Sequence, residues 1–177
     1  ALREGRIDID LGSLAPRDPE VQTVLLAQQH LVGAVQPGHP LLQGRLTARR
    51  FADARHVEIP LSSRDASPVD EALQSLGLQR FVAMTVHSSY GALVVAARSQ
   101  LVACVPQVMA QAMQATLKLE VFKLPLAVRA VPRYMAWHPR YSADPAHQTF
   151  RACLQTVMDP QNWRQPQGAA ARKAAAA

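Results

Sequence analysis

The apolar run Leu101–Val105 constrains the fold of this chain more than any other segment. It reads LVACV and contains no charged residue, which is typical of a strand buried on both faces of a sheet. Helical patterns flank it, because the small-residue segment Tyr90–Ala97 precedes it and Pro106 starts a helix that extends to about Gln114. Such a strand needs a covering layer on each side, so we expect helices on both faces of a sheet.

Strand and helix patterns alternate along the rest of the chain. Alternating or β-rich residues predict strands over 7–12, 21–26, 31–35, 56–61, 81–86, 117–123 and 128–137. A short helix is expected over 46–52, with Thr47 as its cap. Another helix begins at Ser67, where Ser67 and Asp70 have the spacing of a capping box. This alternation favours an α/β fold with a largely parallel sheet.

The composition is that of a globular protein. The chain has 177 residues, of which 49% are hydrophobic and 18% charged, enough for one ordinary domain or two small lobes. The formal net charge of +6 raises the question of a nucleic-acid partner. The arginines are scattered, however, and aromatic residues make up only 5%, so a basic solvated surface is the simpler interpretation. No apolar run approaches the ~18 residues of a membrane span, and no membrane partner is expected.

Two cysteines, Cys104 and Cys153, lie within apolar patterns. They are most simply buried, reduced thiols of a cytosolic protein, although the sequence leaves a disulfide open. The chain begins ALREGRID, without an initiator methionine or a signal peptide. This start has the pattern of a helix end running into a strand, as in the middle of a fold.

Sequence motifs for cofactor and metal binding are absent. The chain has no G-x-G-x-x-G, Walker, H-E-x-x-H, C-x-x-C or G-x-S-x-G motif. Asp8 and Asp10 share one face of a strand, but no further metal ligand accompanies them, so a polar strand face is the simpler interpretation. His138 and His147 likewise lack a second His or Cys at ligand spacing. We therefore expect no cofactor and no metal site.

The polar cluster His87–Ser88–Ser89 follows a predicted strand and starts a predicted helix. In an open α/β sheet, ligands bind beyond the carboxyl ends of the strands, and free N–H groups at a helix start favour an anion. Three interpretations stay open: contact with a ligand, a plain helix cap, and a Ser–His nucleophile, for which no orienting acid is identifiable. Ser62, Ser63 and Arg64 follow the strand at 56–61 in the same way, with weaker specificity.

A strand–turn–helix pattern fills residues 135–151, which read MAWHPRYSADPAHQTFR. Apolar residues end a strand, a polar turn containing Pro139 follows, and Asp144 and Pro145 are the N-cap and first residue of a helix. Apolar residues of this helix recur at helical spacing, so one stripe is predicted to face a core. They are Ala146, Phe150, Cys153, Leu154 and Val157.

Together with three earlier segments, this stretch resembles the C-terminal effector-binding domain of LysR-type transcriptional regulators, and within them the nodulation and aromatic-degradation subgroup. The earlier segments are LREGRIDIDLGS, HPLLQGRLTARRFADARHV and VDEALQSLGLQRFVAMTVHSSYGALVVAARSQLVACVPQ. The ordered set extends from about Leu2 to Met158. The usual Trp-Leu-Arg of the last helix is replaced by Thr149–Phe150–Arg151. The family's N-terminal winged helix-turn-helix, linker helix and first strand–helix–strand have no counterpart here.

The resemblance implies an α/β, two-lobed periplasmic-binding-protein-like (type 2) fold with two crossovers and an incomplete first lobe. The crossovers are expected near 56–63 and 125–134. Residues 1–61 would form part of lobe I, 62–126 lobe II, 127–160 the return to lobe I, and 161–177 a disordered tail. Because lobe I is incomplete, we expect the sheet around Ile7–Leu11 and the last helix to lose neighbours, and the chain alone to be poorly soluble or domain-swapped.

The function implied by the resemblance is effector sensing without catalysis. A small aromatic or carboxylated molecule would bind between the lobes and control transcription through an absent N-terminal helix-turn-helix that binds DNA. The complete protein would be a cytoplasmic homo-oligomer, a dimer or tetramer, that meets RNA polymerase indirectly. An alternative of the same fold is the periplasmic solute-binding protein of a transporter, and a hydrolase using His87 and Ser88 is a further one.

The expected effector contacts fall into two ranks. His87 and Ser88 come first, at the turn between strand and helix. Gly12 and Ser13, at the end of the lobe I strand, come second, together with Ser62, Ser63 and Arg64 at the expected crossover.

Overall fold

A computed structural model describes residues 1–13, 15–16, 18–60 and 67–159 of the chain. The chain divides into two compact units. Unit 1 combines Ala1–Gln28 with the segment that starts at Pro132, and unit 2 is Gln29–Val131. The first division therefore lies near Gln28 and not near residue 61, because the strand at 31–35 pairs within the sheet of unit 2. The expected tail, 161–177, lies outside the described residues.

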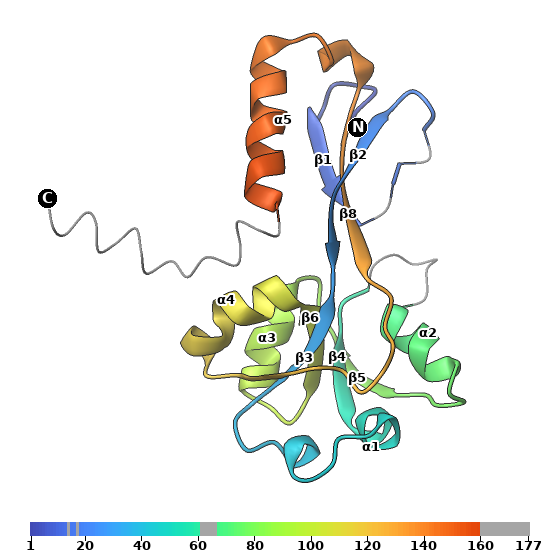
Figure 1. Ribbon diagram of the computed structural model, residues 1–177, viewed down its shortest axis with the longest axis vertical. Helices are drawn as coiled ribbons and strands as arrows, with labels where there is room; N and C mark the ends of the chain where they lie inside the picture. Colours follow the sequence, from blue (N-terminus) through green and yellow to red (C-terminus); the bar gives the residue numbers. More distant parts are fainter. Residues whose placement is uncertain (14, 17, 61–66, 160–177) are drawn as a thin grey trace, which may run out of the picture. The chain divides into compact units, whose positions relative to one another are not determined.

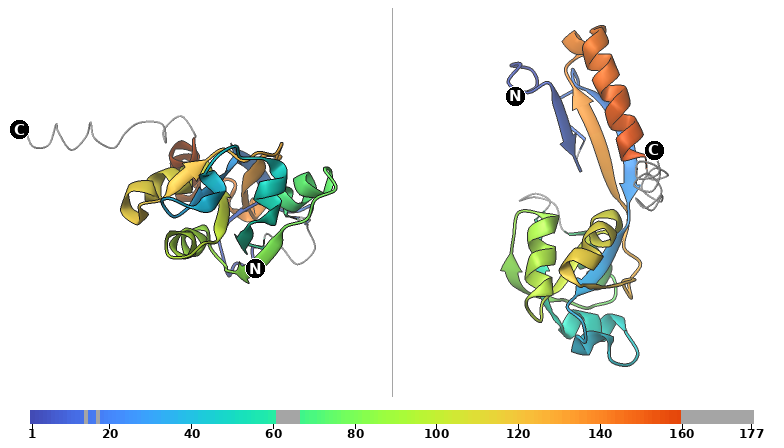
Figure 2. Two further views of the ribbon diagram at one scale, coloured as in Figure 1. Left: turned by 90° about the horizontal axis from the view of Figure 1, so that it is seen from below. Right: turned by 90° about the vertical axis from the view of Figure 1, so that its left-hand side faces the viewer.

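Unit 1 is built on a three-stranded sheet in the order β1-β8-β2. Its strands are β1 (Ile9–Gly12), β2 (Gln22–Gln29) and β8 (Val131–Trp137). β1 runs antiparallel to β8, and Ile9 lies opposite Trp137. The short 3-10 helix η2 (Pro139–Tyr141) and the helix α5 (Pro145–Met158) follow β8, and α5 runs beside that strand (Figure 2).

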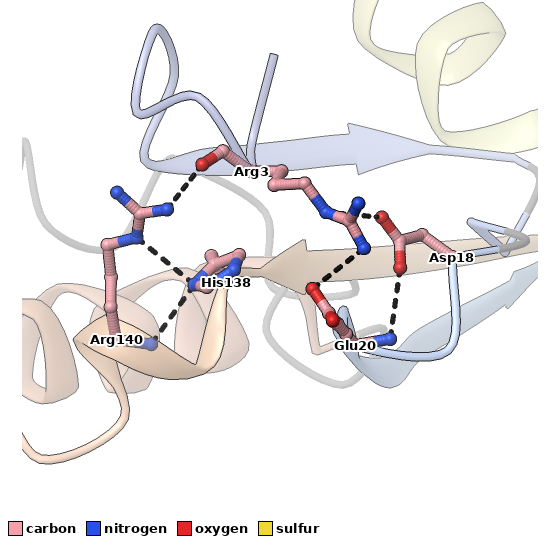
Figure 3. A network of polar contacts seen from close by, with 5 residues as sticks. All are labelled: Arg3, Asp18, Glu20, His138 and Arg140. Atoms are coloured by element: carbon pink, nitrogen blue, oxygen red, sulfur yellow. Dashed lines mark hydrogen bonds and ion pairs between the residues drawn. The ribbon is translucent and has the colours of Figure 1, made fainter.

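Polar contacts tie the N-terminal turn of unit 1 to the end of β8 (Figure 3). Arg3 donates to the Glu20 carboxylate at 2.8 Å and pairs with Asp18 at 3.5 Å. The Arg140 guanidinium donates to the Arg3 carbonyl and, at 3.1 Å, to Nδ1 of His138. His138 is therefore engaged in local structure. Exposed ion pairs of this kind contribute little to stability, so this network mainly fixes the geometry of the turn.

Unit 2 contains a five-stranded sheet in the order β5-β4-β6-β3-β7 (Figure 1). Its strands are β3 (Leu31–Val35), β4 (Arg55–Glu58), β5 (Phe81–Thr85), β6 (Val102–Pro106) and β7 (Glu120–Phe122). β4 is parallel to β5 and β6, whereas β3 is antiparallel to β6 and β7. The sheet is thus mixed and not largely parallel. β3 enters this sheet directly from β2 of the unit 1 sheet, after the single residue His30.

Helices cover both faces of the unit 2 sheet. α3 (Ser89–Ala97) and α4 (Gln107–Leu117) pack on one face, where Leu93, Ala103 and Val105 are fully buried. α1 (Ala48–Asp53) and α2 (Pro68–Gln74) pack on the other, where Phe51 and Val102 are fully buried. Neighbouring residues of β6 therefore enter different cores, which confirms the two-sided burial predicted for this strand.

Local signals predict the helix starts at Thr47, Ser67 and Asp144 correctly, but the capping bonds expected at Ser67 are not formed. The Thr47 hydroxyl accepts from the Arg50 N–H at 3.2 Å, and the Asp144 carboxylate accepts from the His147 N–H at 2.9 Å. Ser67 precedes α2 but makes no such bond to the backbone. Its hydroxyl accepts from Arg80 instead, at 3.3 Å. The expected capping box is therefore absent, because Arg80 occupies the side chains that would have formed it.

The apolar stripe predicted to bury one face of α5 is exposed. Ala146, Phe150, Cys153 and Val157 face solvent, and the half-buried positions are His147, Arg151, Leu154 and Met158. The rotation of the helix is set by polar contacts: the Arg151 guanidinium lies 4.5 Å from the centre of the Trp137 ring and donates to the Tyr141 carbonyl. The prediction of a buried Cys153 is wrong for the same reason, and both cysteines are free thiols.

Candidate functional site

The turn between β5 and α3 is the candidate site in unit 2. The carboxyl end of β5 is fixed by the Val86 N–H, which donates to the Glu58 carbonyl of the parallel strand β4 at 2.9 Å. His87 and Ser88 come next, and both are exposed. The turn thus lies just beyond the carboxyl end of β5, which is where open α/β sheets bind their ligands.

Ser88 is the N-cap of α3. Its backbone is extended, with φ −150° and ψ 151°, and its hydroxyl oxygen accepts from the Gly91 N–H at 3.0 Å. The Ala92 N–H donates to the Ser88 carbonyl at 3.0 Å. The N–H groups of Ser89 and Tyr90 precede the first bond of the helical ladder and point out of the helix start. Together with the helix dipole they form a small donor set suited to a carboxylate.

The cap interpretation of Ser88 is therefore confirmed, and it leaves the ligand interpretation open. A hydroxyl that accepts one backbone bond keeps its own proton for donation. The Ser88 oxygen is directed at its own helix, and no bond between His87 and Ser88 occurs in the part of the chain that the structure describes. The geometry thus gives no support to a Ser–His nucleophile.

Gly12 and Ser13 belong to unit 1. Gly12 ends β1 and lies opposite Tyr134. The Ser13 hydroxyl accepts from the Arg133 guanidinium at 3.1 Å. Sequence reasoning missed Arg133, because its neighbour Ser13 lies 120 residues away and the β1–β8 register was unknown. Ser62, Ser63 and Arg64, the remaining predicted contacts, lie outside the described residues.

A buried charged cluster in unit 2 was also missed. The Arg80 side chain is 2% exposed, donates to Asp70 at 2.6 and 3.0 Å, and reaches Glu58 at 2.7 Å. Burial lowers the pKa of Arg80, but the Asp70 hydrogen bonds and the nearby carboxylates outweigh it, and the net shift is upward. Arg80 thus joins Glu58 at the end of β4 to Asp70 in the first turn of α2. No local sequence motif predicts a contact among three residues so far apart in the chain.

His56 and Cys104 lie near Arg80 and are electrically neutral. Burial lowers the pKa of His56 to about 4, and the Arg80 charge lowers it further against the hydrogen bond to the Phe51 carbonyl, which raises it. Burial raises the pKa of Cys104 to about 12. Nε2 of His56 bonds to the Phe51 carbonyl at 2.8 Å, so Nδ1 is the unprotonated ring nitrogen. Neither group has the properties of a reactive centre.

A cavity of about 600 Å³ lies at the amino-terminal ends of β4 and β6, the ends opposite to the β5–α3 turn. It is lined by His39, Arg50 and Arg55 among others. The Arg50 guanidinium is occupied by the carbonyls of Arg45, Pro40 and Gln43, at 2.7 to 2.9 Å. His39 bonds to the Leu41 N–H and the Gln100 carbonyl. Arg50 and His39 therefore stabilise the loop that forms this wall of the cavity.

The match to known families decides the identity of the fold. The model of the LysR substrate binding domain matches residues 1–159. The chain belongs to the LysR substrate-binding domain family. The two-lobed periplasmic-binding-protein-like fold expected from the resemblance is that of this family. No helix among the described residues is long and apolar enough to cross a membrane.

Relatives of this LysR domain are transcriptional regulators. The HTH-type regulator SyrM of Rhizobium etli is 31% identical over 163 residues, covering 89% of this chain and 48% of the relative. The activator NahR of Pseudomonas putida is 26% identical over 158 residues, covering 87% of this chain and 51% of the relative. The chain therefore spans about half the length of these relatives.

Solved structures of LysR domains share this architecture. The regulatory domain of MexT from Pseudomonas aeruginosa has a TM-score of 0.74 at 22% identity, covering 88% of this chain and 74% of that one. The effector-binding domain of QuiR in complex with shikimate has a TM-score of 0.68 at 17% identity, covering 85% and 71%. At these identities the likeness concerns the fold alone.

Proposed function

We propose that this chain is the effector-sensing domain of a LysR-type DNA-binding regulator and that it binds a small carboxylated or aromatic molecule. The observation that carries the proposal is the start of α3, where the capped Ser88 and the N–H groups of Ser89 and Tyr90 lie just beyond the carboxyl end of β5. A carboxylate is the group that such a donor set accommodates best.

His87 and Ser88 are assigned distinct roles. Ser88 fixes the helix start through its bond to Gly91 and donates its own proton to an effector oxygen. His87, exposed beside it, contacts the effector through its ring. In unit 1 we assign a second contact set to Gly12 and Ser13, together with Arg133, whose guanidinium donates to the Ser13 hydroxyl. Shikimate and benzoate, the ligands named for the QuiR and BenM domains, are both carboxylates, which supports this choice.

The role in the complete protein rests on the family. Relatives are regulators of the HTH type, and a full-length member, CbnR, has been solved with its target DNA. We propose that the complete protein is a cytoplasmic homo-oligomer that binds DNA through a helix-turn-helix domain and meets RNA polymerase indirectly. Effector binding would shift the population of domain arrangements and so change promoter occupancy. The proposal assigns no catalytic step, and the relatives do not favour the transport alternative.

The test is calorimetric titration of the complete protein with a panel of small aromatic and aliphatic carboxylates. Once a binder is found, Ser88→Asp separates the two roles of that residue. Aspartate is as good an N-cap as serine, so thermal stability should stay unchanged, while its charge repels a carboxylate and should weaken binding roughly tenfold or more.

His87→Ala should weaken binding without changing the unfolding temperature. Ser88→Thr keeps both the cap and the hydroxyl and serves as the matched control. Unchanged affinity in both Ser88→Asp and His87→Ala would contradict the assignment of this site.

A further inference from the structure

The pairing of β4 with β5 is irregular just before the candidate site. His56 lies opposite Val82. The next residue of β4, Val57, lies opposite Met84, so Ala83 has no partner on β4. A bulge of this kind disrupts the ladder locally, and bulges are frequent next to functional sites because they re-aim the residues that follow. The turn after β5 therefore depends on how the strand is held beyond the bulge.

Glu58 holds β5 beyond the bulge. It is the last residue of β4 and lies opposite Thr85, and its carbonyl accepts from the Val86 N–H at 2.9 Å. On the other side of β4, the pairing with β6 extends only from His56 to Val57. Strand ends with few contacts open most readily. The end of β4 thus needs a further anchor to keep the acceptor for Val86 in place.

Val86 connects this bond to the cap of α3. Its side chain is half-buried and packs on the core cluster that includes the inner face of α3. A Cβ atom added to Gly91 would lie 3.1 Å from the Ser88 hydroxyl oxygen and 3.8 Å from Cβ of Val86. Because Gly91 donates to the Ser88 hydroxyl, Val86 lies beside the cap bond. A displacement of Val86 would therefore disturb the donor set at the helix start.

A buried cation supplies the anchor for the end of β4. The Arg80 guanidinium donates to Oε1 of Glu58 at 2.7 Å, and the Arg80 side chain is 2% exposed. Two further bonds to Asp70, at 2.6 and 3.0 Å, hold the same guanidinium on α2. Hydrogen bonds between charged groups are short and strong, and the forked guanidinium holds them in a fixed direction. Arg80 is thus itself held on two sides.

We propose that Arg80 is a positioning residue for the effector site. Through its bond to Glu58 it holds the end of β4, and the Val86 bond then fixes the turn that carries His87 and Ser88. Arg80 precedes the amino end of β5, whereas the turn follows its carboxyl end, so Arg80 acts through the sheet and does not touch the effector. This role rests on the proposed function, since the turn is the same site.

The first test is hydrogen exchange of the complete protein, measured by mass spectrometry on the peptide 86–92. Arg80→Met removes the anchor, whereas Glu58→Ala removes only its contact with β4 and leaves the Asp70 bonds. Both should accelerate exchange of this peptide roughly tenfold, the effect of losing one hydrogen bond to a charged group. Glu58→Gln keeps an acceptor oxygen and should retain most of the protection. If Arg80→Met fails to fold, Glu58→Ala still decides.

Gly33→Ala is the matched control for lost stability. A Cβ atom at Gly33 would meet the Phe122 ring, and β6 separates β3 from β4 in the sheet. Exchange of the turn by local opening does not depend on the stability of the whole unit, so it should stay unchanged in this variant. Unchanged exchange in a folded Arg80→Met or Glu58→Ala variant would overturn the proposal. So would equal acceleration in Gly33→Ala, because lost stability alone would then explain the effect.

Effector affinity is the second readout. Calorimetric titration of the same variants uses benzoate and the other carboxylates of the panel as probes. Glu58→Ala should weaken binding roughly tenfold, and Glu58→Gln and Gly33→Ala should leave it nearly unchanged. Unchanged affinity in Glu58→Ala despite faster exchange would overturn the assignment of Arg80 to the site. If the unmodified protein binds no carboxylate of the panel, the proposed function fails, while exchange of the peptide 86–92 still decides whether Arg80 positions the turn.

Discussion

The ring of Phe122 lies directly over Gly33. The two residues are opposite each other in the antiparallel pair β3–β7, and a Cβ atom added to Gly33 would lie 2.2 Å from Cζ of Phe122. No side chain fits there while the ring stays in place. Glycine is thus required at position 33 because of the Phe122 ring. Its backbone conformation does not require glycine, since Gly33 has no positive φ.

Gly33→Ala should therefore destabilise unit 2 by about 1–3 kcal/mol, the usual cost of overpacking. The measurement is urea unfolding followed by circular dichroism. Phe122→Ala removes the ring and has a cost of its own, but in that background Gly33→Ala should cost almost nothing. Equal costs of Gly33→Ala in both backgrounds would show that the ring is not the cause.

Arg80 should be a main determinant of stability in unit 2. Arg80→Met would leave Glu58, with a side chain 17% exposed, and Asp70 without their shared cation. We expect a loss of about 2–4 kcal/mol in the free energy of unfolding. Arg80→Lys should recover only part of it, because an ammonium cannot reproduce the forked contact.

The control for Arg80 is Arg49→Met. Arg49 pairs with Asp53 at 3.8 Å, and both side chains are mostly exposed, so the loss should stay below about 0.5 kcal/mol. Similar losses for the two variants would mean that burial does not set the strength of the Arg80 contacts.

His56 should make the stability of unit 2 depend on pH. It is neutral in the fold, where its pKa is about 4, and titrates near 6.5 when unfolded. Between these two values the unfolded chain binds the proton and the folded chain does not. The contribution of His56 to the free energy of unfolding is therefore complete above about pH 6.5 and decreases as the pH falls toward 4. The total effect is about 3 kcal/mol at most.

The measurement is denaturant unfolding between pH 7 and pH 4. Because carboxylates also titrate in this range, the comparison is with His56→Gln, which keeps a donor for the Phe51 carbonyl and cannot titrate. The free energy of unfolding of His56→Gln should fall less steeply with decreasing pH than that of the unmodified chain. His87→Gln, at an exposed histidine, should follow the unmodified chain. Parallel curves for His56→Gln and the unmodified chain would refute the role of His56.

Features set by neighbouring residues could be predicted from the sequence. The helix starts at Thr47 and Asp144 depend on residues three positions apart, and the structure has both. The two-sided burial of β6 follows from its own apolar run. The cap role of Ser88 is also local, because its partner is Gly91.

Features set by distant partners could not be predicted. Asp70 and Ser67 have a local pattern that favours a capping box, but a cation ten residues beyond Asp70 binds both of them. The rotation of α5 follows from Arg151 meeting Trp137, and helical periodicity alone places the apolar stripe on the inner face. In the same way, Ser13 acquires its Arg133 partner only through strand pairing across 120 residues.

The division near Gln28 and Val131 has a consequence for the order of folding. Unit 2 is one uninterrupted stretch of chain. Unit 1 needs residues from two distant segments, because Ile9 of β1 pairs with Trp137 of β8. During synthesis, unit 2 can complete its sheet before β8 leaves the ribosome, and β1 remains without its neighbour until then. The long-range pairing of β1 with β8 should thus be the slow step. Until it occurs, the side of β1 that pairs with β8 has unpaired backbone groups that a chaperone or another nascent chain can reach.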